Sequence, residues 1–248
     1  MNWSFQLYSA RNFQPWAHVL ETLARLGYAH VEGFGEAYSD PAGLRAELDR
    51  NGLTMPSGHF SMAMLEQDFH AVEHISEVLG IELVVCPWLD ERERPRDAAG
   101  WRALGGRLAA IGDRAENVGL DFAWHNHDFE FLPLADGSVP MELVLEAAPN
   151  MGWEIDVAWV TRAGASAIDW IEQQSNRIVA AHVKDIALDG EAREEDGWSD
   201  VGHGTIDWPW LLKALRNRTR ARYFVMEHDN PADFERFARR SIEAAKNF

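Results

Sequence analysis

Short apolar runs alternate with longer amphipathic stretches along the whole chain. The predicted strands are Trp3–Tyr8, His30–Phe34, Leu53–His59, Leu83–Trp88, Asp121–His127, Trp153–Asp156, Ile178–Lys184 and Tyr223–Glu227. Several of these runs are almost continuously apolar, which is typical of parallel strands that are buried on both faces. The pattern therefore predicts a parallel sheet whose strands are covered by helices.

Helical periodicity fills the intervals between these strands. The predicted helices are Pro15–Leu26, Pro41–Asn51, His70–Leu79, Ala98–Asn117, Pro140–Ala148, Ala167–Ser175, Trp208–Arg216 and Pro231–Lys246. Proline stands near several of the helix starts, where its missing N–H costs nothing. Glycine follows several of the helix ends, where a left-handed residue closes the last turn.

Eight strands that alternate with eight helices, at about 30 residues per unit, predict a single (β/α)8 TIM barrel over residues 1–248. No linker or low-complexity segment divides the chain. A doubly wound open sheet is the alternative fold. That fold would carry a glycine-rich turn after the first strand, and the sequence YSARNF has none there.

The charge of the chain narrows the class of partner. Twenty-three basic and 40 acidic side chains give a net charge of −17, which disfavours nucleic acid and anionic membranes as partners. The basic stretch Arg216–Arg222 is predicted to end a helix and face water. The apolar runs are too short to cross a membrane, and the N-terminus lacks the pattern of a signal peptide. Cys86 is the only cysteine, so we expect a cytoplasmic protein without an internal disulfide.

Polar side chains stand where the predicted strands end, and barrel enzymes carry their chemistry at these ends. They are Glu32, His59, Trp88, His125 to Glu130, Asp156, His182, Lys184, Glu227 and His228. Because buried ionisable groups are costly unless paired or bound to metal, the last four strands predict a metal site. The predicted ligands are Glu130, Asp156, His182 and Glu227. This oxygen-rich set suits one divalent ion, Mn²⁺ or Mg²⁺ first, with Zn²⁺, Co²⁺ or Fe²⁺ as alternatives.

Five segments together resemble the xylose isomerase-like TIM barrels, the sugar phosphate isomerase/epimerase group. They are HNHDFEF (125–131), EIDVAWVTRAG (154–164), RIVAAHVKD (177–185), VGHGTIDW (201–208) and VMEHD (225–229). In that family a Glu, Asp, His, Glu set binds one divalent ion. The resemblance implies Asp156, His182 and Glu227 as ligands, while His125 and His127 compete with Glu130 for the first position. His203 stands where the family usually has Glu, so that loop is expected to contact a different group of the substrate.

The resemblance also implies the chemistry. A divalent ion would polarise the carbonyl of a keto sugar or polyol, so that Glu130 and Glu227 could move the neighbouring proton through an enediolate. This makes an isomerase or epimerase the first choice. His125 or His127 could instead protonate a leaving hydroxyl. Family members with the HNH sequence include dehydratases and lyases that act on keto-cyclitols, such as inosose dehydratase, and on keto-glycosides.

Other residues are expected to contact the substrate, namely His59, Glu32, Trp88, Lys184 and His203. Each site residue also has a purely structural interpretation. Lys184 would face the helices and pair with Asp185, His182 would be a core histidine, and the tryptophans would belong to the core. The alternative functions are a metal-dependent endonuclease, which the charge disfavours, and a sugar-binding barrel without turnover. A homo-oligomer is compatible with the sequence.

Overall fold

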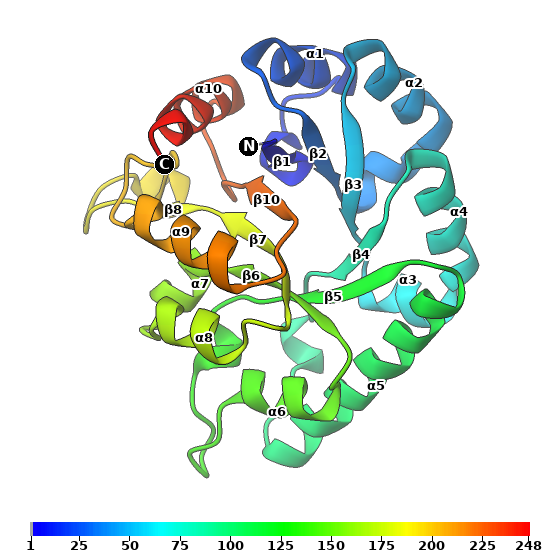
Figure 1. Ribbon diagram of the computed structural model, residues 1–248, viewed down its shortest axis with the longest axis vertical. Coiled ribbons are helices and arrows are strands. Elements are labelled where there is room, and N and C mark those ends of the chain that lie inside the picture. Colours follow the sequence, from blue (N-terminus) through cyan, green and yellow to red (C-terminus); the bar gives the residue numbers. More distant parts are fainter. Residues whose placement is uncertain (1) are drawn as a thin grey trace.

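The computed structural model describes residues 2–248 and shows eight parallel strands closed into one barrel (Figure 1). The strands are β1 (Ser4–Gln6), β2 (His30–Gly33), β3 (Thr54–His59), β4 (Leu83–Cys86), β5 (Asp121–His125), β6 (Gly152–Asp156), β7 (Ile178–Val183) and β10 (Tyr223–Met226). Around the barrel they follow chain order, and β10 pairs with β1 to close it. The predicted TIM barrel is thus confirmed, and each of its strands falls within or next to a predicted run.

The helices form a layer around the outside of the barrel (Figure 1). They are α1 (Trp16–Leu26), α2 (Pro41–Asn51), α3 (Met62–Gln67), α4 (Phe69–Leu79), α5 (Ala98–Asn117), α6 (Pro140–Ala147), α7 (Val157–Arg162), α8 (Ala167–Gln173), α9 (Trp208–Arg218) and α10 (Phe234–Ala244). Short 3-10 helices also occur, namely η1 (Leu7–Ala10), η2 (Gly35–Ser39), η3 (Glu91–Glu93), η4 (Phe129–Phe131), η5 (Arg193–Glu195) and η6 (Ala245–Asn247). Helices α3 and α7 were not predicted. Among residues 2–248, no helix combines the length and the apolar character that a membrane crossing requires.

Local chemistry explains the ends of α2. Asp40 caps its N-terminus, because the side chain accepts a hydrogen bond from the backbone N–H of Gly43 at 2.9 Å. Pro41 follows in the first turn. At the other end Gly52 adopts a φ of 65°, a left-handed conformation that ends the helix. Strand β3 therefore begins shortly after this turn, at Thr54.

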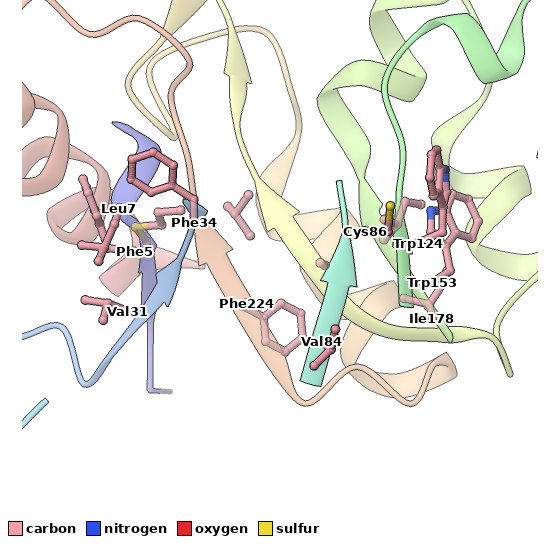
Figure 2. Close-up of a cluster of buried hydrophobic side chains, with 14 of the residues drawn as sticks. Phe5, Leu7, Val31, Phe34, Val84, Cys86, Trp124, Trp153, Ile178 and Phe224 are labelled. Carbon is pink, nitrogen blue, oxygen red and sulfur yellow. The ribbon is translucent and has the colours of Figure 1, made fainter. Parts of the chain in front are cut away.

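The hydrophobic core lies mainly between the barrel and its helices. Phe5, Val31, Val84, Trp124 and Trp153 belong to this layer and are fully buried (Figure 2). Figure 2 shows Trp124 and Trp153 side by side, as their pairing across β5 and β6 requires. Cys86 lies in the same layer, and burial raises the pKa of its thiol to about 12. Cys86 therefore packs as a small buried hydrophobe.

The inside of the barrel has a different character. Its apolar part is a small cluster of Leu83, Val85, Ala123 and Ala180. Buried polar side chains of other strands also occupy the interior, among them Gln6, Glu32, Glu154 and His182. Because side chains alternate between the two faces of a strand, each barrel strand contributes apolar residues to the outer core and other residues to the interior. The barrel therefore encloses a polar layer.

A hairpin that was not predicted follows β7. Strand β8 (Asp185–Ile186) pairs antiparallel with β9 (Trp198–Ser199). The Asp185 carboxylate then accepts hydrogen bonds from the backbone N–H groups of Ile186 and Gly202, each at 2.9 Å, and of Ile206 at 3.1 Å. A Cβ on Gly204 would lie 2.3 Å from that carboxylate. The Asp185 side chain thus fixes the loop 201–206 against the hairpin.

The basic stretch at the end of α9 faces water as predicted. The Arg222 guanidinium forms an ion pair with Asp121 at 2.5 Å, and Arg218 pairs with Glu172. All four side chains are about half exposed, so these pairs contribute little to stability.

Candidate metal centre and active site

The last four barrel strands bring four potential metal ligands together. His125 ends β5, Asp156 ends β6, His182 lies in β7, and Glu227 directly follows β10. One ligand atom from each of these residues lies within 4.8 Å of those of the other three, and all four residues are buried. Asp156 and His182 are direct partners in the parallel pairing of β6 and β7. The barrel therefore presents two imidazoles and two carboxylates at one point.

The ring of His182 lies between two carboxylates. Its Nδ1 atom lies 2.9 Å from Oε2 of Glu227, and its Nε2 atom lies 2.7 Å from Oε1 of Glu32. When Nε2 carries the proton and donates it to Glu32, the lone pair of Nδ1 points to the side of Glu227. Carboxylates commonly hold metal-binding histidines in this way. Glu32, expected to contact substrate, instead lies on the side of His182 remote from Glu227 and is fully buried.

A second group of possible ligands adjoins the first and shares two of its histidines. It consists of His59, His125, Glu154 and His182, again with ligand atoms within 4.8 Å of one another. Oε2 of Glu154 lies 2.8 Å from Nε2 of His59 and 3.3 Å from Nε2 of His182. His59, also expected to contact substrate, is thus part of a buried network that includes Glu32 at 3.1 Å.

Sequence reasoning did not identify Glu154 and Gln6 as members of this network. The Gln6 amide donates a hydrogen bond to Oε1 of Glu32 at 2.8 Å. Glu154 stands two residues before Asp156, so strand alternation places both side chains on the same face of β6. That spacing was the available signal for Glu154.

Neighbouring charges and burial shift the pKa values of this network in opposite directions. Burial disfavours the charged forms, but His59 and His182 hold the pKa of Glu32 well below its usual value and lower the pKa of Glu154 to about 2. Burial would likewise lower the pKa of His59, but Glu32 and Glu154 raise it to about 9. The pKa of His182 is raised because its three carboxylate neighbours outweigh burial. Without a metal, these shifts favour ionised carboxylates and protonated imidazoles.

Several buried polar atoms of the two groups and of the neighbouring Glu32 lack a hydrogen-bond partner among residues 2–248. They are Oε2 of Glu32, Oε1 of Glu154, Oδ2 of Asp156 and Nδ1 of His125. Nδ1 of His125 approaches Oε2 of Glu154 to 3.2 Å, and Oδ2 of Asp156 lies 3.4 Å from Nζ of Lys184. Unpartnered buried polar atoms are costly, and a cation would satisfy those that face the four ligands. The donor set and its unmet needs fit a divalent metal ion.

Lys184 lies inside this site, and the expectation that it pairs with Asp185 is wrong. Its Nζ atom lies 2.8 Å from Asp229, 2.9 Å from Glu227 and 3.4 Å from Asp156. The cause is strand alternation, because residue 184 follows His182 by two and points to the same side. Asp229, which sequence reasoning missed, follows Glu227 by the same interval. The Lys184 ammonium thus contacts two of the proposed ligands, Asp156 and Glu227, and also contacts Asp229.

Glu130 does not join the group of four ligand atoms. It lies in η4, where Oε1 accepts a hydrogen bond from the Trp124 indole at 3.1 Å and Oε2 accepts one from the His127 N–H at 3.0 Å. Burial raises the pKa of this carboxyl group to about 8. Glu130 therefore fixes the turn after β5, and of the three candidates for the first ligand, His125 is the one that the structure places beside Asp156, His182 and Glu227.

Asn126 joins the strands that carry two of the ligands. Its Oδ1 atom accepts hydrogen bonds from the Asp156 N–H and from the Trp153 indole, each at 2.9 Å. Its amide group also donates to the Asp156 carbonyl at 3.2 Å. Asp156 in turn caps α7 through the N–H of Trp159 at 2.9 Å. These contacts fix the backbone at the end of β6.

His127 and Trp88 lie on the outer side of the four ligands. The His127 ring is 5.3 Å from the His125 ring and 4.8 Å from the Trp88 ring. Burial, together with the charge of Lys184, lowers the pKa of His127 to about 3. His203 is exposed on the loop 201–206 that Asp185 fixes. Of the expected substrate contacts, Trp88 and His203 thus present accessible surface.

Comparison with known proteins finds a related sequence and similar folds. The Rhizopine catabolism protein MocC of Rhizobium meliloti is 25% identical over 244 residues, covering 86% of this chain and 74% of that protein. A crystal structure of a sugar phosphate isomerase/epimerase from Parabacteroides distasonis superimposes with a TM-score of 0.82 at 20% identity, covering 98% of this chain and 94% of the other.

Two further solved structures share the barrel. The probable 3-DHS dehydratase AsbF, involved in petrobactin synthesis in Bacillus anthracis, has a TM-score of 0.79 at 12% identity and covers 100% of this chain and 99% of its own. The IOLI protein, whose structure holds a zinc atom, has a TM-score of 0.78 at 17% identity, covering 100% of this chain and 96% of the other. Residues 20–248 also match the model that describes the Xylose isomerase-like TIM barrel. Because this match spans more than half of the chain, the protein belongs to the Xylose isomerase-like TIM barrel family.

Proposed function

We propose that this protein is a divalent-metal-dependent isomerase or epimerase that acts on a keto sugar or polyol through an enediolate. The observation that carries the proposal is the convergence of His125, Asp156, His182 and Glu227 within 4.8 Å at the ends of four strands. Buried imidazole and carboxylate atoms that converge in this way are typical of a site that binds a cation. Membership of the family and the likeness to a sugar phosphate isomerase/epimerase support a carbohydrate substrate.

Two imidazoles and two carboxylates make a softer ligand set than the three carboxylates and one imidazole expected from sequence. Mn²⁺ remains the first choice, and the second imidazole favours Zn²⁺, Co²⁺ or Fe²⁺ over Mg²⁺. The zinc atom in the structure of the IOLI protein supports a site of this type on the same fold. When bound, the ion would polarise the substrate carbonyl and supply positive charge for the developing enediolate.

Two residues of the chain, Glu227 and His127, are placed to take part in the proton transfers. Glu227 follows β10 and His127 follows β5, and these strands are separated by β7 and β6 around the barrel. A sugar carbon between them would present one face to each residue. We propose that Glu227 is the base that removes the proton from this carbon. We propose that His127 is the residue that faces the opposite side of the same carbon. Glu130 was expected to be the second base. It would reach substrate only after breaking its hydrogen bonds with the Trp124 indole and the His127 N–H.

A dehydratase or lyase that acts on a keto-cyclitol or keto-glycoside is the second candidate. The supporting observation is the pair of imidazoles beside the ligands, with the rings of His125 and His127 5.3 Å apart. An imidazole at this point could hydrogen-bond a β-hydroxyl as it leaves, and loss of that hydroxyl as water would turn the same enediolate into an enone. The barrel fold shared with a probable dehydratase is compatible with this chemistry.

Two measurements test the proposal. Metal analysis of the purified protein should find about one divalent ion per chain, and Glu227→Gln should lose both the ion and turnover. Incubation of the wild type with a panel of keto sugars in D₂O should introduce deuterium at the α-carbon. Deuterium uptake without water loss supports the isomerase or epimerase, and an enone supports the dehydratase. A protein that takes up no metal, and whose Glu227→Gln variant acts like the wild type, would overturn the proposal.

A further inference from the structure

A cavity lies at the amino ends of several barrel strands, away from the candidate metal ligands. Its volume is about 880 Å³, which lies within the range of small-molecule binding sites. It is bounded by α5, by the starts of β5, β6 and β7, and by the segment that precedes β10. His125, Asp156 and His182 lie at or near the other ends of the same three strands. The cavity is therefore separate from the site of the proposed reaction.

Acidic and basic side chains line this cavity in equal number. They are Asp113, Glu116, Asp121, Arg177, Arg220 and Arg222. Arg222 forms an ion pair with Asp121 at 2.5 Å. Within residues 2–248, none of the remaining four side chains forms an ion pair with another residue. Their opposite charges are therefore too far apart to neutralise each other directly, although they face the same cavity.

Arg177 is half-buried and lacks a negatively charged partner among residues 2–248. Its guanidinium donates hydrogen bonds to the carbonyls of Met151 at 2.8 Å, of Leu145 at 3.2 Å and of Ala148. These oxygens satisfy its N–H groups but bring no negative charge, and burial lowers the pKa of the guanidinium. A partly buried cation without a counter-ion is unfavourable. An anionic group of a ligand would supply that counter-ion from the cavity.

Arg220 and two acids of α5 add groups that can bind a ligand of both charges. Arg220 is exposed, and its backbone N–H donates to the Ile178 carbonyl at 3.1 Å. Its guanidinium can bind a carboxylate through two parallel hydrogen bonds. Asp113 and Glu116 are also exposed and stand three positions apart in α5, so they lie on the same side of the helix. Their carboxylates can therefore accept hydrogen bonds from one ammonium group.

The cavity also has apolar surface and open space. Leu120 and Val179 are half-buried and line it. Gly112 lines it from within α5, where a Cβ would contact only Phe122, at the ordinary distance of 3.5 Å. The glycine therefore leaves space that a side chain would otherwise fill. The carbon chain of a ligand can occupy this space against the apolar surface.

We propose that this cavity is a second binding site of the protein and that it binds a small amino carboxylate. Arg177 and Arg220 bind the carboxylate, and Asp113 and Glu116 bind the ammonium. The charges that line the cavity cancel, so a ligand whose own charges cancel leaves it neutral. A simple anion would meet the two acids without an ammonium to offset them. A phosphate would add excess negative charge to the same surface.

A series of probes with different charge separations tests the proposal, namely 4-aminobutanoate, 6-aminohexanoate and 8-aminooctanoate. In calorimetric titration of the metal-loaded wild type, at least one of them should bind at least about tenfold more tightly than the simple carboxylate and the simple amine of the same length. Arg220→Gln and Glu116→Gln should each weaken that binding at least about tenfold. Gly112→Leu, which introduces a strong helix former, should block it. Arg218→Gln is the matched control, since Arg218 pairs with Glu172 outside the cavity.

The outcomes are independent of the proposed reaction, because Glu227→Gln should bind the amino carboxylate as tightly as the wild type. Binding that is lost in Glu227→Gln but kept in Arg220→Gln would place the ligand at the metal centre and overturn the proposal. No preference over the simple carboxylates, or equal binding in Arg220→Gln and Glu116→Gln, would also overturn it. Phosphoethanolamine that binds more tightly than every amino carboxylate would overturn the assigned ligand class.

Discussion

The Nε2 atom of His182 lies 2.7 Å from Oε1 of Glu32, although the two residues are 150 positions apart in the chain. Both side chains are fully buried. As acceptor, Glu32 holds the proton of the imidazole on Nε2 and leaves Nδ1 free to bind a metal beside Glu227. Glu32 is itself held by the Gln6 amide. The orientation of a proposed ligand therefore depends on a residue at the opposite end of the chain.

Replacing Glu32 should weaken metal binding without removing a ligand. We expect Glu32→Gln to lower the affinity for Mn²⁺ or Zn²⁺ about 10- to 100-fold, because the amide is a poorer acceptor for the imidazole N–H. Competition titration with a chelating dye measures this effect. Glu235→Gln is the control, since Glu235 forms only an exposed pair with Arg25. An unchanged affinity in Glu32→Gln would show that Glu32 does not position His182.

A pair of variants distinguishes the two candidates for the first ligand. His125→Ala should reduce metal affinity at least about 100-fold, because it removes one of four ligand atoms. Glu130→Gln should retain about one ion per chain, since Glu130 contacts Trp124 and the His127 N–H instead. Metal content measured by plasma mass spectrometry checks both. The opposite result, with metal lost only in Glu130→Gln, would restore Glu130 as the ligand.

The stability of the metal-free protein should fall between pH 6.5 and 9. The unfolded His59 has a pKa of about 6.5, and its carboxylate neighbours raise the folded pKa to about 9. Its contribution is therefore complete below pH 6.5 and is lost as the pH rises through 9. We expect this loss to reach up to about 3 kcal/mol. Urea unfolding at pH 6 and pH 9.5 measures it.

Two histidine variants identify the source of that pH dependence. His59→Gln should reduce the fall in the free energy of unfolding over this range, and the raised pKa values of Glu130 and His182 account for the part that remains. His70→Gln should keep the fall of the wild type, because the His70 side chain is 91% exposed. If both variants lose stability as steeply as the wild type, the titration of other groups causes the effect.

The loop that carries His203 should depend on one carboxylate. Asp185→Ala should lower the free energy of unfolding by about 2–4 kcal/mol, because three backbone N–H groups lose their charged acceptor. Asp189→Ala, at an exposed position of the same hairpin, should have little effect. Urea unfolding of the two variants side by side tests the difference. Equal stabilities would show that the loop holds its shape without Asp185.

Most helices and strands were predictable because the helical period extends over many residues and the apolar runs of the strands are almost continuous. Helix α5 was predicted with both ends correct, and β3 with one residue too many. Helices α3 and α7 were missed because each has only six residues, too few to establish a helical period. In addition, Asp156 both ends β6 and caps α7, so the strand signal concealed the helix start.

The position of a site residue was predictable where that residue stands at the end of a strand. Asp156, His182 and Glu227 lie close together in the structure because parallel strands end at the same face of a barrel. The choice between Glu130 and His125 depends on the direction of one carboxylate, and the Trp124 indole decides that direction. A contact between side chains in a turn leaves no periodic signal in the sequence.

The polar layer inside the barrel also constrains how the barrel can form. Glu154 and Asp156 alternate with Trp153 and Ile155 along β6, all of them buried. A slip of one residue would turn both carboxylates toward the apolar outer layer and drive the tryptophan into the interior. Such a barrel would bury charges without their histidine and lysine partners, which is strongly unfavourable. Misaligned closure is thus penalised twice, and the register that closes the barrel is also the one that brings the ligand atoms together.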